Sequence, residues 1–569
     1  MGRSERFSVT DTAPGKLDPI TVEVIRHKLE GIANEMESTL LRSSFSPIVK
    51  EGLDASASLF SPSGETLAQA CAVPIHLATL IPCVKAFLGE FPVASMQEGD
   101  VYIMNDPYCG GTHLPDIALA VPIFHEGKVF AISATMTHHQ DVGGMTAGSI
   151  PTNATEIFQE GIRIPPLKLR DAGAMNDTLV KMLRLNVRIP DMFMGDLNAQ
   201  IAGCQIGARR LAELAANTGL DLLAAVFDEL LTRSEAMTRA ALRTIPEGTY
   251  RYFDWLDNDG VDFDKKVRIE VAVTVKDGSM HVDFTGTSPQ LRGPFNCVSS
   301  GSHAAAYFAV RALTDPTIPT NAGCFRPVTL HLPVGSLVNP VAPAPVGSRT
   351  ATIKRITGCI LGAFKDILPE KVPADAGGIL LTLAFGGRGR DGKSFVTGEL
   401  IAGGSGAGAR SDGVDVIETD ATNCMNLPAE AMEMEAPIRV HRMSLRRDSG
   451  GAGRQRGGLG LLKEFEVLTD NVTLTHRGER HSHAAAGSHG GFAGALSHSR
   501  LVRAGGVTQV IDSKLVTTMN SGDRLIVETA GGGGYGEPQT RSRGEVAADV
   551  RNGKISAEAA RVSYHLQAG

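Results

Sequence analysis

The sequence lacks the features of several specialised protein classes. Its formal net charge is −7, so it has no excess of basic residues of the kind that binds nucleic acid or an anionic membrane. No apolar run approaches the roughly 20 residues of a membrane-spanning helix. The first residues, MGRSERFSVTDTAPGKLDP, contain no apolar core of a secretory signal. We therefore expect a cytoplasmic protein without nucleic-acid or membrane partners.

Closely spaced cysteine pairs are also missing. The eight cysteines occur singly, and no C-x-x-C motif is present. Zinc ribbons and thioredoxin-like redox sites need such pairs, so both are excluded. The thiols are expected to be free and mostly buried, as is usual for cysteine.

The length and the residue patterns predict a large α+β protein, with an N-terminal α/β half and a β-rich C-terminal half. A chain of 569 residues exceeds what one small core needs. Asp18 and Pro19 can cap a helix whose apolar residues follow at spacings of three or four, and residues 176–240 are also helical in pattern. We expect a flexible arm (1–17), an α/β domain (18–243), a mixed region (244–375), a glycine-rich β domain (376–540) and a helical tail (541–569).

The stretch GRGRDGKS, residues 387–394, matches the phosphate-binding pattern G-x-x-x-x-G-K-[ST] letter for letter. A working phosphate loop needs a helix after it, because the helix N-terminus supplies the amides that hold phosphate. The following residues, FVTGELIAGG, are β-branched and apolar without helical periodicity. We therefore predict a β-hairpin, with strand 377–386 turning at 388–392 into strand 394–402.

Two further motifs come close to known binding patterns. ETAGGGGYGEP matches G-x-G-x-x-G at residues 531–536, but proline and polar residues follow where a dinucleotide site requires a helix. These glycines are expected to permit close backbone approach or to form an anion-binding nest. The histidine-rich stretch 476–499 is predicted to be a surface loop. The alternative is a mobile loop that covers the substrate and in which Arg477 or Arg480 binds an anion.

The strongest candidate site lies between residues 106 and 141. The segments NDPYCGGTHLPD and MTHHQDVGG contain Asp106, His113, Asp116, His138, His139 and Asp141. Because both segments adjoin predicted strands, their side chains can converge at one end of a sheet. Neutral imidazoles with carboxylates and no thiolate favour a catalytic metal site with open positions, while a purely structural polar network is the alternative. The two adjacent histidines should face opposite sides of a strand, and the spacing leaves open which one points inward.

Together, NDPYCGGTHLPD, MTHHQDVGG, HVDFTGTSPQLRGPFN, DSGGAGRQRGGLG and GGGGYGEP resemble the hydantoinase B/oxoprolinase family. The resemblance runs from the Asp18-Pro19 helix to Gly536. The family includes the B subunits of ATP-dependent N-methylhydantoinases and caprolactamase-type lactamases, and related subunits of acetone and acetophenone carboxylases.

The resemblance implies a division of labour in a two-component enzyme. A hydantoinase A-type subunit with an actin/sugar-kinase-like fold holds ATP and Mg²⁺ and phosphorylates a small cyclic amide or imide. The B subunit carries a divalent metal, Zn²⁺ or Mn²⁺, and completes the reaction, so a paired AB hetero-oligomer is expected. By motif, the metal ligands are His113, Asp116 and His138, with Asp54 of KEGLDAS as the fourth.

The same resemblance implies the chemistry. The metal acts as a Lewis acid and water opens the ring. Our own hypothesis is that His139 or Asp141 takes the proton from water, with support of the metal ligands as their alternative role. Two alternatives remain open at this point. One is a carboxylase component that forms a C–C bond, and the other is a non-catalytic scaffold.

Overall fold

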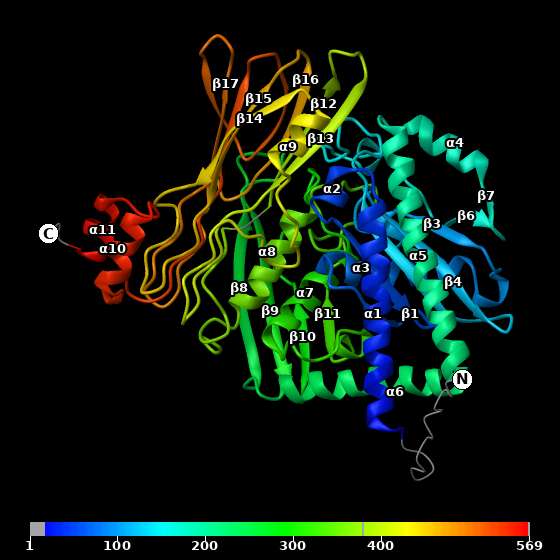
Figure 1. Ribbon diagram of the computed structural model, residues 1–569. Helices are drawn as coiled ribbons and strands as arrows, with labels where there is room; N and C mark the ends of the chain where they lie inside the picture. The colour runs from blue at the N-terminus through cyan, green and yellow to red at the C-terminus, as the bar shows by residue number, and fades with distance from the viewer. Residues whose placement is uncertain (1–16, 378–379, 567–569) are drawn as a thin grey trace, which may run out of the picture.

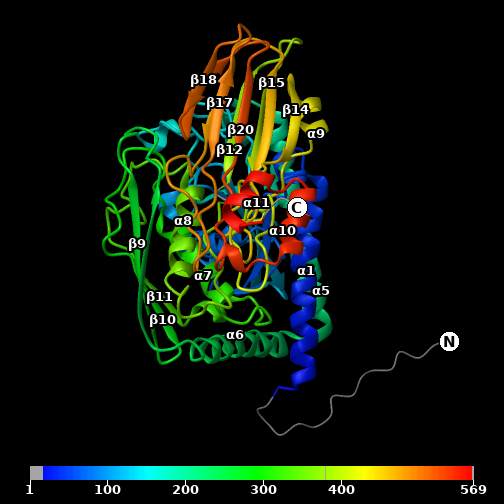
Figure 2. The same ribbon diagram turned by 90° about the vertical axis from the view of Figure 1, so that its left-hand side faces the viewer.

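The computed structural model describes residues 17–377 and 380–566, so the predicted arm lies almost wholly outside the described chain. Helices and β-sheets are mixed throughout, which confirms the α+β class. The helix-rich N-terminal half and the long strands of the C-terminal half occupy different parts of the molecule (Figure 1). In the view turned by 90°, the C-terminal strands again extend away from helix α6 (Leu220–Leu242) (Figure 2).

The N-terminal sheet has the strand order β2-β1-β5-β4-β3-β6-β7, with antiparallel neighbours. Its strands are β1 (Ala55–Phe60), β2 (Thr66–Gln69), β3 (Val101–Met104), β4 (Asp116–His125), β5 (Lys128–His138), β6 (Leu167–Asp171) and β7 (Ala174–Met175). Helix α1 (Pro19–Ser43) contacts β1. Helices α5 (Pro190–Thr218) and α3 (Pro74–Glu90) each contact β1, β4 and β5. Helices α2 (Pro47–Lys50) and α4 (Asp177–Asn186) complete this half.

Helix α1 forms as its sequence predicts. The Asp18 carboxylate accepts hydrogen bonds from the backbone amides of Ile20 and Thr21, which caps the first turn. The stripe Ile25, Leu29, Ile32, Met36 and Leu40 is buried along the helix. Helix α3 was not predicted. Two prolines interrupt its sequence, one at its first position and Pro82 inside it, and they obscure the helical pattern.

The middle region contains a sheet of order β11-β10-β9-β8. Its strands are β8 (Gly248–Leu256), β9 (Val267–Lys276), β10 (Ser279–Asp283) and β11 (Val328–His331). Helices α7 (Ser299–Leu313) and α8 (Arg349–Gly362) share one buried core with this sheet. The N-terminal end of α8 brings Arg349 to Asp116 of the N-terminal sheet.

Two further sheets form the C-terminal half. One has the order β13-β12-β16-β19, with β12 (Leu381–Arg388), β13 (Ser394–Ile401), β16 (Val472–Arg477) and β19 (Lys514–Met519). The other has the order β14-β15-β20-β17-β18, with β14 (Ile438–Leu445), β15 (Leu461–Val467), β17 (His498–Val502), β18 (Thr508–Ile511) and β20 (Arg524–Glu528). Strands β12 and β13 pair antiparallel around residues 389–393, which confirms the hairpin predicted for GRGRDGKS. Helices α9 (Ala429–Glu435), α10 (Arg543–Arg551) and α11 (Ala557–Tyr564) complete the chain.

Glycine-rich segments pack backbone to backbone beneath these two sheets. Amides of residues 404–413, 450–460, 484–495 and 530–536 donate to carbonyls of neighbouring segments, as in the bond from Gly532 to Gly458 (2.9 Å). A Cβ atom on Gly531 would collide with the Ser449 carbonyl, and one on Gly532 with the Ser405 carbonyl. The glycines of GGGGYGEP therefore permit close backbone approach, as predicted.

The four sheets lie within the regions expected from the sequence, although the division into domains stays a prediction. No helix within residues 17–377 and 380–566 is both long and apolar enough to cross a membrane.

Candidate metal centre

The register of the N-terminal sheet brings the predicted ligands together. Asp116 begins β4 and His138 ends β5, and the two residues are direct partners across the antiparallel ladder. On the other side of β5, the His138 amide donates to the carbonyl of Asp54, which precedes β1 (3.1 Å). Three adjacent strand ends therefore place residues 54, 116 and 138 side by side.

His113, Asp116 and His138 form a cluster of metal-ligand type. Each offers one ligand atom, and these atoms all lie within 4.8 Å of one another. His113 is on the loop before β4, and its Nε2 lies 3.0 Å from Asp116 Oδ1. Asp54 joins the group through His76, whose Nε2 is 3.5 Å from Asp54 Oδ1 and 3.4 Å from Asp116 Oδ1.

The hydrogen bonds of His113 indicate that a cation suits this position. Burial, reinforced by the charge of Arg349, lowers the pKa of His113 to about 4, so its ring is neutral near pH 7 and carries one N–H. Both ring nitrogens nevertheless face acceptors, because Nδ1 lies 3.0 Å from the Gly347 carbonyl and Nε2 faces Asp116. When Nδ1 donates to Gly347, the Nε2 lone pair points at a carboxylate oxygen. A metal ion between them removes that repulsion, and the outer hydrogen bond is the arrangement that orients a histidine ligand.

His138 and Asp116 also carry the charge states that a metal requires. Burial and the neighbouring His113 hold the pKa of His138 well below its usual range, so its ring is neutral. Its Nδ1 is buried and has no hydrogen-bond partner within the described residues. Burial disfavours a charge on Asp116, but Arg349, His113 and His76 hold the pKa of its carboxyl well below the usual range. Neutral imidazole and ionised carboxylate are the forms that bind metal.

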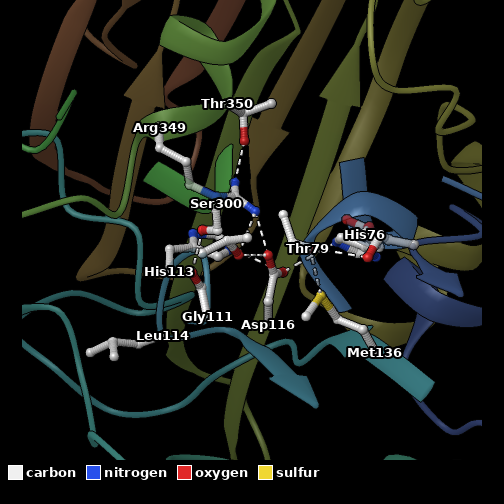
Figure 3. Close-up of polar contacts among 12 residues, drawn as sticks. His76, Thr79, Gly111, His113, Leu114, Asp116, Met136, Ser300, Arg349 and Thr350 are labelled. Atoms are coloured by element: carbon white, nitrogen blue, oxygen red, sulfur yellow. Dashed lines mark hydrogen bonds and ion pairs between the residues drawn. The ribbon is translucent and has the colours of Figure 1, made fainter. Parts of the chain in front are cut away.

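Asp116 divides its two oxygens between different partners. Oδ1 faces His113 and His76, while Oδ2 accepts hydrogen bonds from Arg349 and Thr112. Figure 3 shows Arg349 and Asp116 pointing toward each other, with His113 beside them. The guanidinium therefore fixes the carboxylate while leaving Oδ1 for a cation.

His76 is the site residue that sequence reasoning missed. It lies in the first turn of α3 and is 1% exposed, and its Nδ1 is buried without a partner within the described residues. The local sequence VPIHLATL contains no acidic neighbour, so its pattern matches that of a core helix. Only the packing of α3 against β4 and β5 brings the imidazole to the carboxylates.

The cluster opens into a partly open cavity of about 40 Å³ between the N-terminal and C-terminal halves. Its lining side chains come from both halves and from α8; the polar ones are Asp54, His76, His113, His138, Gln140, Arg349, Thr350, Thr382, Glu399, Thr422 and Arg477. Glu399 is paired there with the buried Lys463. Such a concave site with convergent ionisable groups is the expected setting for chemistry.

His139 and Asp141 are not brought to this cavity. His139 faces the opposite side of the sheet from His138, where its Nε2 lies 3.0 Å from Gln200 Oε1 and its ring packs on Phe193. Asp141 accepts hydrogen bonds from backbone amides of its own loop and pairs with Arg188 (2.9 Å). Both side chains have structural partners instead of substrate access, so the geometry gives no support to a proton-transfer role for either.

The prediction of a surface loop for residues 476–499 is wrong at its start. His476 and Arg477 end strand β16, and both are buried, as are Glu479 and Arg480. Burial disfavours the charged His476 ring and, together with His481, lowers its pKa to about 3. Glycine-rich composition misled the prediction because these glycines pack against backbone instead of solvent.

Comparison with known proteins places the chain in a family. The sequence profile described as Hydantoinase B/oxoprolinase matches residues 18–538. The chain belongs to the hydantoinase B/oxoprolinase family. It is 33% identical to a putative D-/L-hydantoinase B subunit of Pseudomonas sp. strain NS671, over 96% of this chain and 95% of that protein. The membership predicted from the motifs is therefore confirmed.

Solved structures share the fold. A chain of the ATP-dependent caprolactamase from Pseudomonas jessenii superimposes with a TM-score of 0.88 at 30% identity, covering 98% of this chain and 97% of that one. A chain of acetone carboxylase in a nucleotide-free structure gives a TM-score of 0.87 at 20% identity, over 96% and 79% of the two chains. At that identity the second likeness concerns the fold alone.

Proposed function

We propose that this chain is the metal-bearing B subunit of an ATP-dependent enzyme that opens a cyclic amide or imide. The observation that carries the proposal is the convergence of His113, Asp116 and His138 in one cluster, with both ring nitrogens of His113 facing oxygen acceptors. His113, Asp116, His138 and Asp54 would hold Zn²⁺ or Mn²⁺. When bound, such an ion supplies Lewis-acid polarisation of a carbonyl or of water.

ATP is assigned to a partner chain. Residues 387–394 form an exposed hairpin turn without a following helix, so this segment offers no phosphate cradle. A relative named as one component of a hydantoinase supports a second, A-type subunit, and we assign ATP and Mg²⁺ to that partner. The working unit is then a hetero-oligomer that contains both components.

The proposed reaction proceeds through phosphorylation of the amide carbonyl. The partner transfers a phosphoryl group from ATP to the carbonyl oxygen and releases ADP. Water adds to the carbonyl carbon, the ring C–N bond breaks, and the nitrogen leaves with a proton. Hydrolysis of the resulting acyl phosphate by a second water gives the open-chain carboxylate and phosphate. Activation is needed because an amide carbonyl is a poor electrophile toward water.

The chain's own residues position and screen the reacting groups. Arg349 holds the Asp116 carboxylate, and Gly347 fixes the orientation of the His113 ring. The His76 imidazole contacts the carboxylates of both Asp54 and Asp116. We therefore assign to His76 the proton-transfer role that was predicted for His139 or Asp141. The side chains of His76, His113 and Asp116 are almost fully buried, which strengthens the electrostatic interactions among them.

Co-purification with the A-type partner and ATP-dependent turnover tests the proposal. The complex should release ADP and open at least one member of a panel of hydantoins, 5-oxoproline and lactams, and metal analysis should find one divalent ion per chain. Turnover that requires bicarbonate and a ketone would identify a carboxylase instead. An Asp116→Ala complex that keeps both its metal content and its full rate would identify a non-catalytic scaffold.

A further inference from the structure

Arg477 is a buried cation on the wall of the cavity. It ends strand β16 and is 5% exposed, and it lines the same space as Asp54, His113 and His138. Its Nη2 donates to Thr382 Oγ1 (2.6 Å) and its Nη1 to the Gly347 carbonyl (3.3 Å). Both acceptors are neutral, so the positive charge is hydrogen-bonded but not compensated.

This lack of a counter-charge distinguishes Arg477 from the other buried cations of the described chain. Each of the other buried lysines and arginines forms an ion pair with a carboxylate; these residues are Arg349, Lys354, Arg355, Arg456, Lys463, Arg480, Lys514 and Arg541. Arg477 has no carboxylate in ion-pair contact within residues 17–377 and 380–566. Burial of an unpaired charge is strongly unfavourable, and proteins retain such a charge where a ligand pairs with it.

The guanidinium stays charged under ordinary conditions. Burial, with a smaller contribution from the charge of Arg349, lowers the pKa of Arg477 to about 9, which leaves it protonated near pH 7. Among the charged groups described at the cavity, Arg349 is paired with Asp116 and Glu399 with Lys463, so Asp54 and Arg477 are the two lining charges without a direct ion-pair partner of opposite formal charge among lysine, arginine and carboxylate side chains. A divalent metal at the proposed site would therefore leave the cavity with an excess of positive charge.

We propose that Arg477 is the anion-binding residue of this cavity and that it holds an oxyanion of the substrate beside the metal site. A guanidinium presents parallel N–H groups that match the oxygens of a carboxylate or a phosphoryl group. The Gly347 carbonyl contacts both His113 Nδ1 and Arg477 Nη1, so the guanidinium and the ring of a proposed metal ligand share one backbone anchor. The anion is either a carboxylate on the substrate ring or the phosphoryl group of the activated carbonyl. This choice of anions rests on the proposed function, whereas the existence of the anion site does not depend on it.

The test measures binding of simple oxyanions to the purified full-length, metal-loaded chain by calorimetric titration. Inorganic phosphate and acetate are the probes, and the variants are Arg477→Gln and Arg477→Lys. Arg390→Gln, on the exposed turn of the β12–β13 hairpin, is the control that removes the same charge from the surface. We expect Arg477→Gln to weaken binding about 10- to 100-fold, Arg477→Lys to weaken it less, and Arg390→Gln to leave it unchanged.

The two probes separate the two sources of anion. Tighter binding of phosphate assigns the phosphoryl group, and tighter binding of acetate assigns a ring carboxylate. Wild-type protein that binds neither probe, or an Arg477→Gln chain that binds as the wild type does, overturns the proposal.

Thermal unfolding keeps the test meaningful if a variant folds poorly. Without anion, Arg477→Met should raise the unfolding midpoint, because it removes an uncompensated buried charge, and added phosphate should no longer raise that midpoint. A midpoint that still rises with phosphate as in the wild type contradicts the proposal. Loss of oxyanion binding in Arg477→Gln, with no amide opened by the AB complex, would refute only the proposed function.

Discussion

Asp116 and His138 face each other directly across strands β4 and β5, at the point where one strand begins and the other ends. Two residues far apart in the sequence thus become neighbours through the register of a hairpin. A slip of one residue would turn one side chain to the opposite face of the sheet. The centre is therefore as well defined as the hydrogen-bond ladder that supports it.

The two adjacent histidines should respond in opposite ways to mutation. We expect His138→Ala to reduce metal content to background with little loss of stability, because its ring faces the cavity. His139→Gln should retain the metal but lower the free energy of unfolding by about 1–3 kcal/mol, because its ring bonds to buried Gln200. Metal analysis and denaturant unfolding of both variants provide the check. Loss of metal in His139→Gln would show that the ring facing the cavity was wrongly assigned.

His76 should tune the affinity of the metal site. Its imidazole contacts both Asp54 and Asp116, so His76→Asn should weaken metal binding by roughly 10- to 100-fold, as is usual when a residue that orients ligands is removed. Competition with a fluorescent chelator measures the change. Lys85→Gln, at an exposed position of the same helix, is the control and should alter the affinity less than about twofold. Equal effects of the two substitutions would assign the change to distortion of the helix.

Lys393 should be dispensable despite its place in GRGRDGKS. The side chain is exposed at a hairpin turn and 85% accessible, so Lys393→Ala should change stability by no more than ~0.5 kcal/mol. In the complex with the A-type partner, ATP hydrolysis should remain within about twofold of the wild-type rate. A loss of about tenfold or more would restore this segment as a nucleotide site.

The glycine-rich core should reject even one added methyl group. Gly532→Ala places a Cβ against the Ser405 carbonyl, and we expect a loss of about 3 kcal/mol or failure to fold. Gly544→Ala, in helix α10 with open space around it, is the matched control and should be neutral or stabilising by up to ~1 kcal/mol. Thermal unfolding compares the two. Similar midpoints would mean that the packed backbones can separate at little cost.

Local pattern was sufficient for the fold class and for much of the site. The stripe along α1, the hairpin at 387–394 and the cluster near His113 are all encoded in short stretches whose periodicity or turn residues can be read directly. Asp54 was reached only through a family resemblance, because its neighbours carry no ligand pattern. Its place beside His138 depends on the pairing of β1 with β5, two strands that are far apart in the sequence but adjacent in the sheet.

What could not be predicted depends on contacts between remote segments. His76 reaches the carboxylates through the packing of a helix that two prolines disguise. Arg477 is buried because β12 and β19 flank β16 on both sides, whereas its glycine- and histidine-rich surroundings resemble a solvent-exposed loop. That His138 and His139 lie on opposite sides of the sheet follows from strand alternation, but which side holds the cavity does not.

The backbone-to-backbone core also shapes how the chain responds to heat. Peptide groups that separate on unfolding expose polar surface, which lowers the heat capacity, whereas apolar surface raises it. The segments that surround residues 531–534 pack mainly through backbone atoms, so their unfolding exposes little apolar side-chain surface. The heat-capacity increment of unfolding should consequently lie below the ~12–15 cal/mol/K per residue of ordinary globular proteins, which gives the chain a flatter stability curve over temperature.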